Sequence, residues 1–236
     1  MIDQLPANIQ TMFLDMNGTF MFGHDRLGDE QNFYPAYVAE GGAGLAADSL
    51  NASVRRVIAA LDDLYHAGTH DTNFPQVLDM AARVLGGEVS DDDIARVGRV
   101  IAAHEFGVLS DSNADMLVAL AKRYRLYVVS NLWSPSARWR AYFDARLGGK
   151  IFSGLVFSSD IAANKPAPEI FEYALRMADA NPADVVMVGD DAARDIRPAA
   201  DMGMTTIWVS GERSHDGCTE RVITEFGQLY STKATL

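Results

Sequence analysis

The chain has 236 residues, of which 48% are hydrophobic and 22% charged, a composition typical of a globular protein. Its formal net charge of -12 argues against a nucleic-acid-binding surface, because such surfaces gather Lys and Arg to displace counterions. A single cysteine, Cys218, excludes an intramolecular disulfide, and no apolar run is long enough to span a bilayer, so we expect a cytoplasmic protein that binds no membrane.

The first twenty residues lack the basic region and the small-residue cleavage site of a secretory signal, so we expect no such signal. The first apolar run, TMFLD (11–15), predicts a strand buried on both faces. This strand ends on a carboxylate, Asp15, and Gly18 and Thr19 follow shortly after it.

About a hundred residues without a comparable strand pattern follow. Amphipathic stretches in this region predict helices at 51–67, 74–85 and 91–107, and a further helix at 112–124 leads back to the sheet. We therefore place a helical insertion at 21–108, which divides a core formed by 1–20 and 109–236. Gly23 and Gly107, near the ends of the insertion, are the expected hinges.

Strand and helix patterns alternate in the second half of the chain. The predicted strands cover 126–131, 155–160, 185–190 and 205–210, and the predicted helices cover 136–147, 167–180, 192–203 and 217–229. Short connections between such elements indicate an α/β fold with a doubly wound, Rossmann-like parallel sheet.

Four of the five predicted strands end in polar residues: Asp15, Ser130 with Asn131, Asp160 and Asp190. The carboxyl ends of parallel strands lie at one edge of the sheet, where ligands bind, so we expect these groups to converge on one crevice. Each of them alone is more often a turn former or a helix cap. Their joint occurrence favours a site.

Four segments, FLDMNGT, VVSN, NKPAPEIF and VGDDAARDI, resemble in this order the signature motifs of the haloacid dehalogenase-like hydrolase superfamily. Alone, KPAP could be a helix start and GDD a capped turn; the ordered set carries the resemblance. The insertion is similar to the helical (C1-type) cap of that superfamily. The resemblance implies a hydrolase that acts on a small phosphorylated molecule with Mg²⁺.

The resemblance also implies a role for each motif residue. Asp15 is the nucleophile that forms an aspartyl-phosphate, and Lys165 offsets the negative charge. Phosphoryl oxygens are bound by Thr19, Ser130 and Lys165. Asn131, directly after Ser130, is expected to bind the substrate or phosphoryl oxygens or to be an ordinary turn residue. The magnesium ligands are Asp15, Asp190 and the main-chain carbonyl of Asn17, with support from Asp191 or Asp195. Independently of the family, a hard dication would relieve the repulsion between so many carboxylates.

Asn17 departs from the phosphatase pattern, in which a second Asp donates and accepts a proton. An amide can hydrogen-bond but cannot exchange a proton near neutral pH. Three hypotheses stay open: a magnesium-dependent phosphohydrolase or phosphotransferase, slow or selective for good leaving groups; a dehalogenase-like enzyme that attacks carbon through Asp15; and a non-catalytic module that binds a phosphorylated ligand. The acidic fourth motif favours the first, because carbon–halogen cleavage in this superfamily needs no magnesium.

Several other residues have a local interpretation. His66 and His70 are four residues apart, but Gly68 interrupts the helix between them, which favours surface or packing roles. Trp139 is expected in the core, and Trp133 in the core or at the crevice. His24, Asp25 and Arg26 follow the first motif closely and are expected at the hinge into the insertion, where a side chain could reach the crevice. Arg26 would there form a salt bridge or bind a substrate anion, and Arg194 is expected at a solvent-facing helix position.

Overall fold

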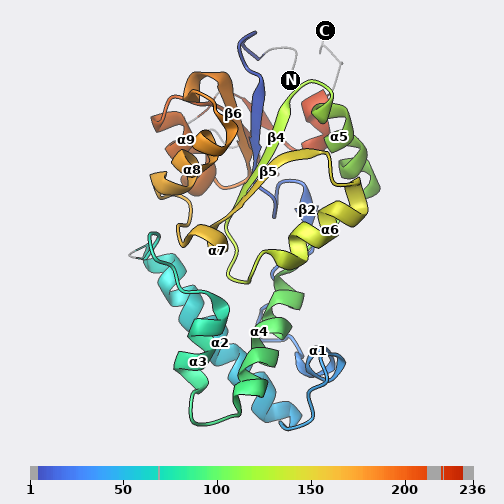
Figure 1. Cartoon of the computed structure of the whole chain (residues 1–236), viewed down its shortest axis with the longest axis vertical. Helices are drawn as coiled ribbons and strands as arrows, with labels where there is room; N and C mark the ends of the chain where they lie inside the picture. The colour runs from blue at the N-terminus through green and yellow to red at the C-terminus, as the bar shows by residue number, and fades with distance from the viewer. Residues whose placement is uncertain (1–4, 69, 212–218, 220, 231–236) are drawn as a thin grey trace.

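A computed structural model describes residues 5–68, 70–211, 219 and 221–230. Its main feature is a sheet of six parallel strands in the order β5-β4-β1-β6-β7-β8 (Figure 1). The strands are β1 (Thr11–Leu14), β4 (Arg125–Ser130), β5 (Phe152–Phe157), β6 (Val185–Gly189), β7 (Thr205–Val209) and β8 (Val222–Ile223). The predicted α/β fold with a Rossmann-like parallel sheet is confirmed.

Helices cover both faces of the sheet, which is why its central strands are almost wholly apolar. Met12 and Leu14 of β1 pack in the cluster with α5 (Asp111–Ala121) and α6 (Ala137–Leu147). Phe13, between them, points to the opposite face and packs with α8 (Pro168–Ala178). Because successive side chains of a strand point to opposite faces, the short strand β1 contributes to the hydrophobic layers on both sides of the sheet.

The segment between β1 and α5 forms a separate helical unit, below the sheet in Figure 1. It contains α1 (Tyr34–Ala39), α2 (Ala47–Ala67), α3 (Val77–Leu85) and α4 (Asp91–Glu105). These helices bury their own hydrophobic cluster. Inside it, the Tyr37 hydroxyl donates to Asp93 Oδ1 at 2.5 Å, and Ser90 caps α4 by accepting from the Asp93 N–H. Such a cap satisfies an otherwise unpaired helix N–H.

Two of the connections between the helical unit and the sheet are formed by main-chain hydrogen bonds. One is an antiparallel pair formed by β2 (Met21–Phe22) and β3 (Val108–Leu109), at the two ends of the unit. In the other, the loop after α2 lies beside the loop before Lys165: the Asn164 N–H donates to Asp71 O, and the Asn73 N–H donates to Ala162 O, both at 2.6 Å. The second connection places the end of α2 against the carboxyl edge of the sheet.

Two predictions near strand ends are wrong in part. Strand β5 stops at Phe157, and Asp160 lies in the one-turn helix α7 (Ser158–Ile161). Its carboxylate accepts hydrogen bonds from the Ser136 hydroxyl at 2.7 Å and from the Arg140 guanidinium at 2.6 Å, so it does not converge on the crevice. The cause is local, because the polar residues after Phe157 begin a helix.

The prediction of a helix at 217–229 is also wrong within the described residues, 219 and 221–230. Residues 217, 218 and 220 lie outside the described residues, but 222–223 form β8 and Phe226–Tyr230 form a 3-10 helix. The helix predicted at 192–203 is a π-helical turn, Ala192–Ile196, that continues into α9 (Arg197–Asp201). In the part of the chain that the structure describes, no helix is long and apolar enough to cross a membrane.

Candidate active site

Asp15 follows β1 at the carboxyl edge of the sheet and is 6% exposed. Its Oδ1 accepts hydrogen bonds from Lys165 Nζ at 2.6 Å and from the Ser130 hydroxyl at 3.1 Å, and its Oδ2 accepts from the Thr19 hydroxyl at 3.2 Å. Residues of the first three motifs thus meet at one carboxylate, although up to 150 positions of sequence separate them.

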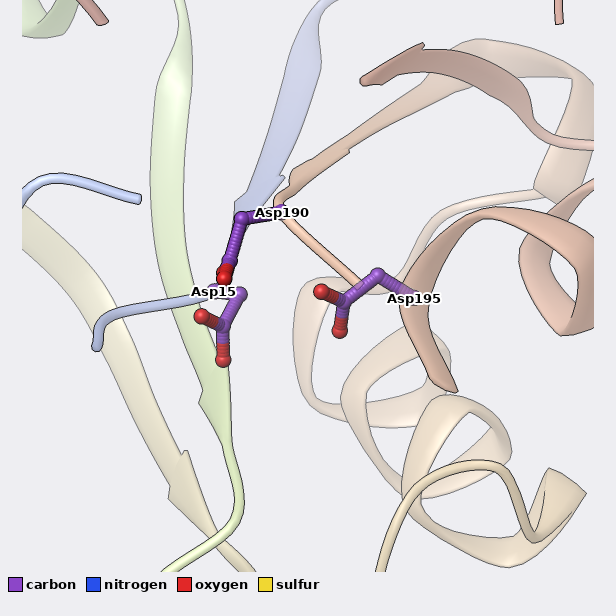
Figure 2. Close-up of side chains that lie close together, drawn as sticks. All are labelled: Asp15, Asp190 and Asp195. Atoms are coloured by element: carbon purple, nitrogen blue, oxygen red, sulfur yellow. The ribbon is translucent and has the colours of Figure 1, made fainter. Parts of the chain in front are cut away.

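Two aspartates of the fourth motif complete the cluster (Figure 2). Oxygen atoms of Asp15, Asp190 and Asp195 all lie within 4.8 Å of one another. Asp190 accepts from the Thr19 hydroxyl at 3.0 Å, and Asp195 accepts from Lys165 Nζ at 2.5 Å. The Lys165 ammonium therefore bridges two of the three carboxylates, and Thr19 bridges the third to Asp15.

Two glycines allow the carboxylates to approach so closely. Gly18 has a φ of +82°, and a Cβ at this position would lie 2.2 Å from Asp190 Oδ2. A Cβ on Gly189 would lie 2.3 Å from Asp195 Oδ2. Both distances are far below van der Waals contact, so each position requires glycine for steric reasons.

The cluster carries more negative than positive charge. Burial, followed by the charges of Asp15 and Asp195, raises the pKa of Asp190 to about 8. Burial also raises the pKa of Asp195 to about 7, although Lys165 opposes this shift. Burial alone would lower the pKa of Lys165, but the ion pairs with Asp15 and Asp195 outweigh it and raise this pKa above the usual range. One ammonium does not balance three carboxylates.

This donor set fits a magnesium ion. The cluster offers carboxylate oxygens, which Mg²⁺ prefers, and a raised Asp190 pKa shows that the site favours additional positive charge. Both Asp195 oxygens are engaged, by Lys165 and by the Asp191 N–H. The Asp191 carboxylate instead caps the π-helical turn by accepting from the N–H groups of Ala193 and Arg194. Asp15, Asp190 and Asp195 are the residues whose oxygens lie close enough together to hold the ion.

The cluster lies in a cavity of about 660 Å³ between the sheet and the helical unit. One face of α2 lines its far side at helical spacing, with Arg55, Ile58, Ala59, Asp62, Tyr65 and His66. Trp133 also lines the cavity, whereas Trp139 is fully buried, as predicted for the core. The Arg55 guanidinium donates to the main-chain carbonyls of Asp29 and Gln31, so it holds the neighbouring loop in place.

Asn131 connects the third motif to α2. Its Oδ1 accepts from the Lys165 N–H at 2.8 Å, and its Nδ2 donates to Lys165 O at 3.0 Å and to the Tyr65 hydroxyl at 3.1 Å. In these contacts the amide orients the main chain of Lys165. A direct contact between Asn131 and substrate stays a prediction.

Arg194 is not the solvent-facing residue that the sequence suggested. Its side chain is 18% exposed, and it donates to Lys165 O at 2.8 Å and to Tyr65 O at 2.9 Å. The guanidinium carbon lies 3.7 Å from the centroid of the Tyr65 ring, a cation–π contact. The prediction failed because the π-helical turn and the end of α2 meet in space, which no local pattern records.

Asn17 lines the cavity, and its Oδ1 is buried without a hydrogen-bond partner among the described residues. His66 and His70 do not lie on one helix. His66 Nε2, on α2, lies 3.3 Å from Asp62 Oδ1, and His70 is exposed beyond the end of this helix. Arg26 does not line the cavity. Its guanidinium donates to Gly23 O and Ala103 O, which ties the loop after β2 to the end of α4.

His24 and Asp25, which the sequence places near the hinge, line the cavity, as does Glu105, which the sequence analysis did not single out. Glu105, the last residue of α4, accepts from the N–H groups of Trp133 at 2.7 Å and Ser134 at 3.1 Å. Burial raises its pKa to about 7 despite these hydrogen bonds. The only indication of Glu105 in the sequence was its position at the end of an amphipathic helix, just before Phe106 and Gly107. Nothing in the sequence showed that its carboxylate would be buried.

The family model of the haloacid dehalogenase-like hydrolases matches residues 9–203, and the chain belongs to this family of hydrolases. The chain is 28% identical to the glyceraldehyde 3-phosphate phosphatase of Pyrococcus furiosus over 170 residues, which are 68% of this chain and 70% of that protein. It is 30% identical to the N-acylneuraminate-9-phosphatase of Mus musculus over 104 residues, 44% of this chain and 41% of that protein. The second match thus spans less than half of the relative.

Solved structures share the fold. A 2-haloacid dehalogenase from Pseudomonas syringae superposes with a TM-score of 0.63 at 21% identity, over 94% of this chain and 96% of that one. A phosphatase of the same superfamily from Thermococcus onnurineus gives a TM-score of 0.61 at 19% identity, with the same coverage of both chains. A hydrolase of this superfamily from Bacillus subtilis, bound to magnesium, gives 0.60 at 19% identity over 94% and 97% of the two chains. The recognition of the superfamily from four short motifs is confirmed.

Glu105 leads to a prediction on stability. Because its pKa is higher in the folded than in the unfolded chain, its contribution to stability is full below about pH 4.5 and is lost as pH rises through about 7. Between pH 6 and 8 this loss amounts to about 1 kcal/mol. In Glu105→Gln the free energy of unfolding, measured with urea at several pH values, should therefore fall less steeply over this range than in the wild type. Parallel curves for the two proteins would contradict the assignment.

Proposed function

We propose that the protein is a magnesium-dependent phosphohydrolase or phosphotransferase that acts on a small phosphorylated metabolite through Asp15. The observation that supports this most strongly is the position of the Asp15 carboxylate, at the base of a cavity and in contact with Lys165, Ser130 and Thr19. The two similar phosphatases act, by their names, on small phosphorylated compounds. The single cysteine supports a cytoplasmic location.

In this proposal one oxygen of Asp15 attacks phosphorus, and the bond from phosphorus to the leaving oxygen breaks. Lys165 and the Ser130 hydroxyl lie beside the nucleophile, where they can donate to phosphoryl oxygens as negative charge moves onto them. A water molecule then attacks the aspartyl-phosphate and releases phosphate, which restores Asp15. Magnesium, held by Asp15, Asp190 and the main-chain carbonyl of Asn17, would neutralise the phosphoryl oxygens. Asp195 would hold Lys165 in place.

We further propose that residues 21–108 serve as a cap that covers the substrate. The face of α2 that lines the cavity supports this role, as do the Tyr65 contacts with Asn131 and Arg194. Gly23 has a φ of +68°, and Gly107 lies where a Cβ would come within 3.2 Å of Phe22 O, so both ends of the unit depend on glycine. A cap of this kind would exclude water during phosphoryl transfer.

Asn17 leads to a prediction on leaving groups. Because an amide cannot protonate a departing oxygen, 4-nitrophenyl phosphate and acetyl phosphate should be hydrolysed far faster than ethyl phosphate. Asn17→Asp should raise the rate on ethyl phosphate by about 10²-fold, the usual effect of a general acid, with much less gain on the other two. The measurement is kcat/KM by phosphate release. Equal rates across these substrates in the wild type would contradict the selectivity for good leaving groups, and halide release from 2-haloacids, unaffected by a chelator, would favour attack on carbon.

The metal ligands lead to a second prediction. EDTA should abolish phosphate release from 4-nitrophenyl phosphate, and Mg²⁺ should restore it. Mg²⁺ should also raise the thermal midpoint of the wild type, because a ligand that binds the folded state stabilises it by mass action. Asp190→Asn should lose both effects, while Asp201→Asn, at the exposed end of α9, serves as the matched control. A thermal shift with Mg²⁺ that is as large in Asp190→Asn as in the wild type would contradict this site.

A further inference from the structure

The proposed reaction lacks a proton donor, because Asn17 occupies the place of the usual carboxylic acid. His24 lines the cavity, and its Nδ1 is buried without a hydrogen-bond partner among the described residues. The other ring nitrogen, Nε2, lies 3.4 Å from Asp25 Oδ2. A carboxylate on one nitrogen of an imidazole fixes the ring and leaves the other nitrogen available for proton transfer.

The loop that carries His24 is held in a defined conformation. Gly23 and Asp25, on either side, have φ values of +68° and +51°, in the left-handed region. Arg26 anchors the turn, since its side chain donates to Gly23 O at 2.9 Å and to Ala103 O at 2.8 Å, and its N–H donates to His104 O. Backbone conformations of this kind cost energy in a residue with a side chain and tend to occur at functional sites.

His24 and Asn17 lie beside the same glycine. A Cβ on Gly107 would be 3.3 Å from His24 Cβ and 3.5 Å from Asn17 Oδ1. The carboxylates in this region also lie close enough to influence one another. Asp25 interacts electrostatically with Asp15 and with Glu105. The ionisable groups around His24 therefore include Asp25 and Arg26 on its own loop, Glu105 from α4, and Asp15 with its partner Lys165 from the core.

We propose that His24, oriented by Asp25, is the general acid and base of the reaction and takes over the proton transfer that Asn17 cannot perform. This inference rests on the proposed function. In the first step Asp15 bonds to phosphorus, the bond to the leaving oxygen breaks, and His24 Nδ1–H gives its proton to that oxygen. In the second step neutral His24 takes a proton from water, whose oxygen bonds to phosphorus as the bond from phosphorus to Asp15 breaks.

Other cavity groups are less suitable for this role. Both oxygens of Glu105 accept main-chain N–H groups, so this carboxylate is committed to holding Trp133 and Ser134 in place. His66 projects from α2 on the far wall, next to Asp62, and is exposed. His24 also lines the cavity, and it differs from both because its Nδ1 is buried without a hydrogen-bond partner among the described residues.

The test compares leaving groups in His24 variants. His24→Ala and His24→Asn should each reduce kcat/KM on ethyl phosphate by about 10²-fold, the size of a general-acid effect, and should reduce kcat/KM on 4-nitrophenyl phosphate far less, because nitrophenolate needs no proton. The ratio kcat/KM is compared because it reports the steps up to the aspartyl-phosphate and not its hydrolysis, which both substrates share. His24→Asn keeps a polar side chain but cannot carry a proton, so it separates proton transfer from packing. His70→Ala, which removes an exposed histidine outside the cavity, is the matched control and should change neither rate.

A double variant makes the test sharper. In the Asn17→Asp background the restored carboxylic acid makes His24 redundant, so His24→Asn should then cost less than about threefold on ethyl phosphate. Two groups with the same role show such coupling. Added imidazole should restore part of the activity of His24→Ala.

Equal losses on the two substrates, or the same loss with Asn17→Asp as without it, would overturn the inference about His24. Such a result would leave the proposed function intact, provided that the wild type still releases phosphate with Mg²⁺. Failure of the wild type to hydrolyse any phosphoester or acyl phosphate would instead refute the proposed function itself. The thermal midpoint of each variant and its shift with Mg²⁺ show whether the fold and the aspartate cluster are intact.

Discussion

The buried ammonium group of Lys165 is the interaction on which the site depends. It lies between Asp15 and Asp195 at 2.6 and 2.5 Å, and these three residues are at most 6% exposed. Burying such charges is costly unless each is paired, so removal of one partner would leave the others uncompensated. The close approach allowed by Gly18 and Gly189 and the capped turn after β6 all serve to bring these charges together.

The same constraint extends to the helical unit. Asn131 and Arg194 both bond the main chain of Lys165, and both also contact Tyr65 near the end of α2. The position of Lys165 and the position of α2 are therefore set by a common pair of side chains. Because these two side chains contact both Lys165 and Tyr65, a movement of the helical unit would change the surroundings of Lys165.

The sequence predicted most of what continuous patterns can encode. The buried apolar runs were correctly predicted to form the strands β1, β4, β6 and β7. The aspartates that follow β1 and β6, Asp15 and Asp190, lie close together as expected. The failures fall where local pattern and tertiary contact diverge. Asp160 follows an apolar run but begins a helical turn, and Arg194 lies in a polar segment but packs on Tyr65. The choice between Asp191 and Asp195 depends on side-chain direction, which spacing alone does not give.

The residue at position 17 changes where the reaction must find its proton. With an aspartate there, donor and nucleophile would belong to the same loop of the core and would keep a fixed relation to each other. His24 and Asp25 instead lie beyond β2, on the segment that leads into the helical unit, and Arg26 ties this segment to α4. Proton transfer through His24 would therefore depend on the placement of that unit. In the proposed reaction, the exchange of one carboxylate for an amide would thus link chemistry in the core to the conformation of the insertion.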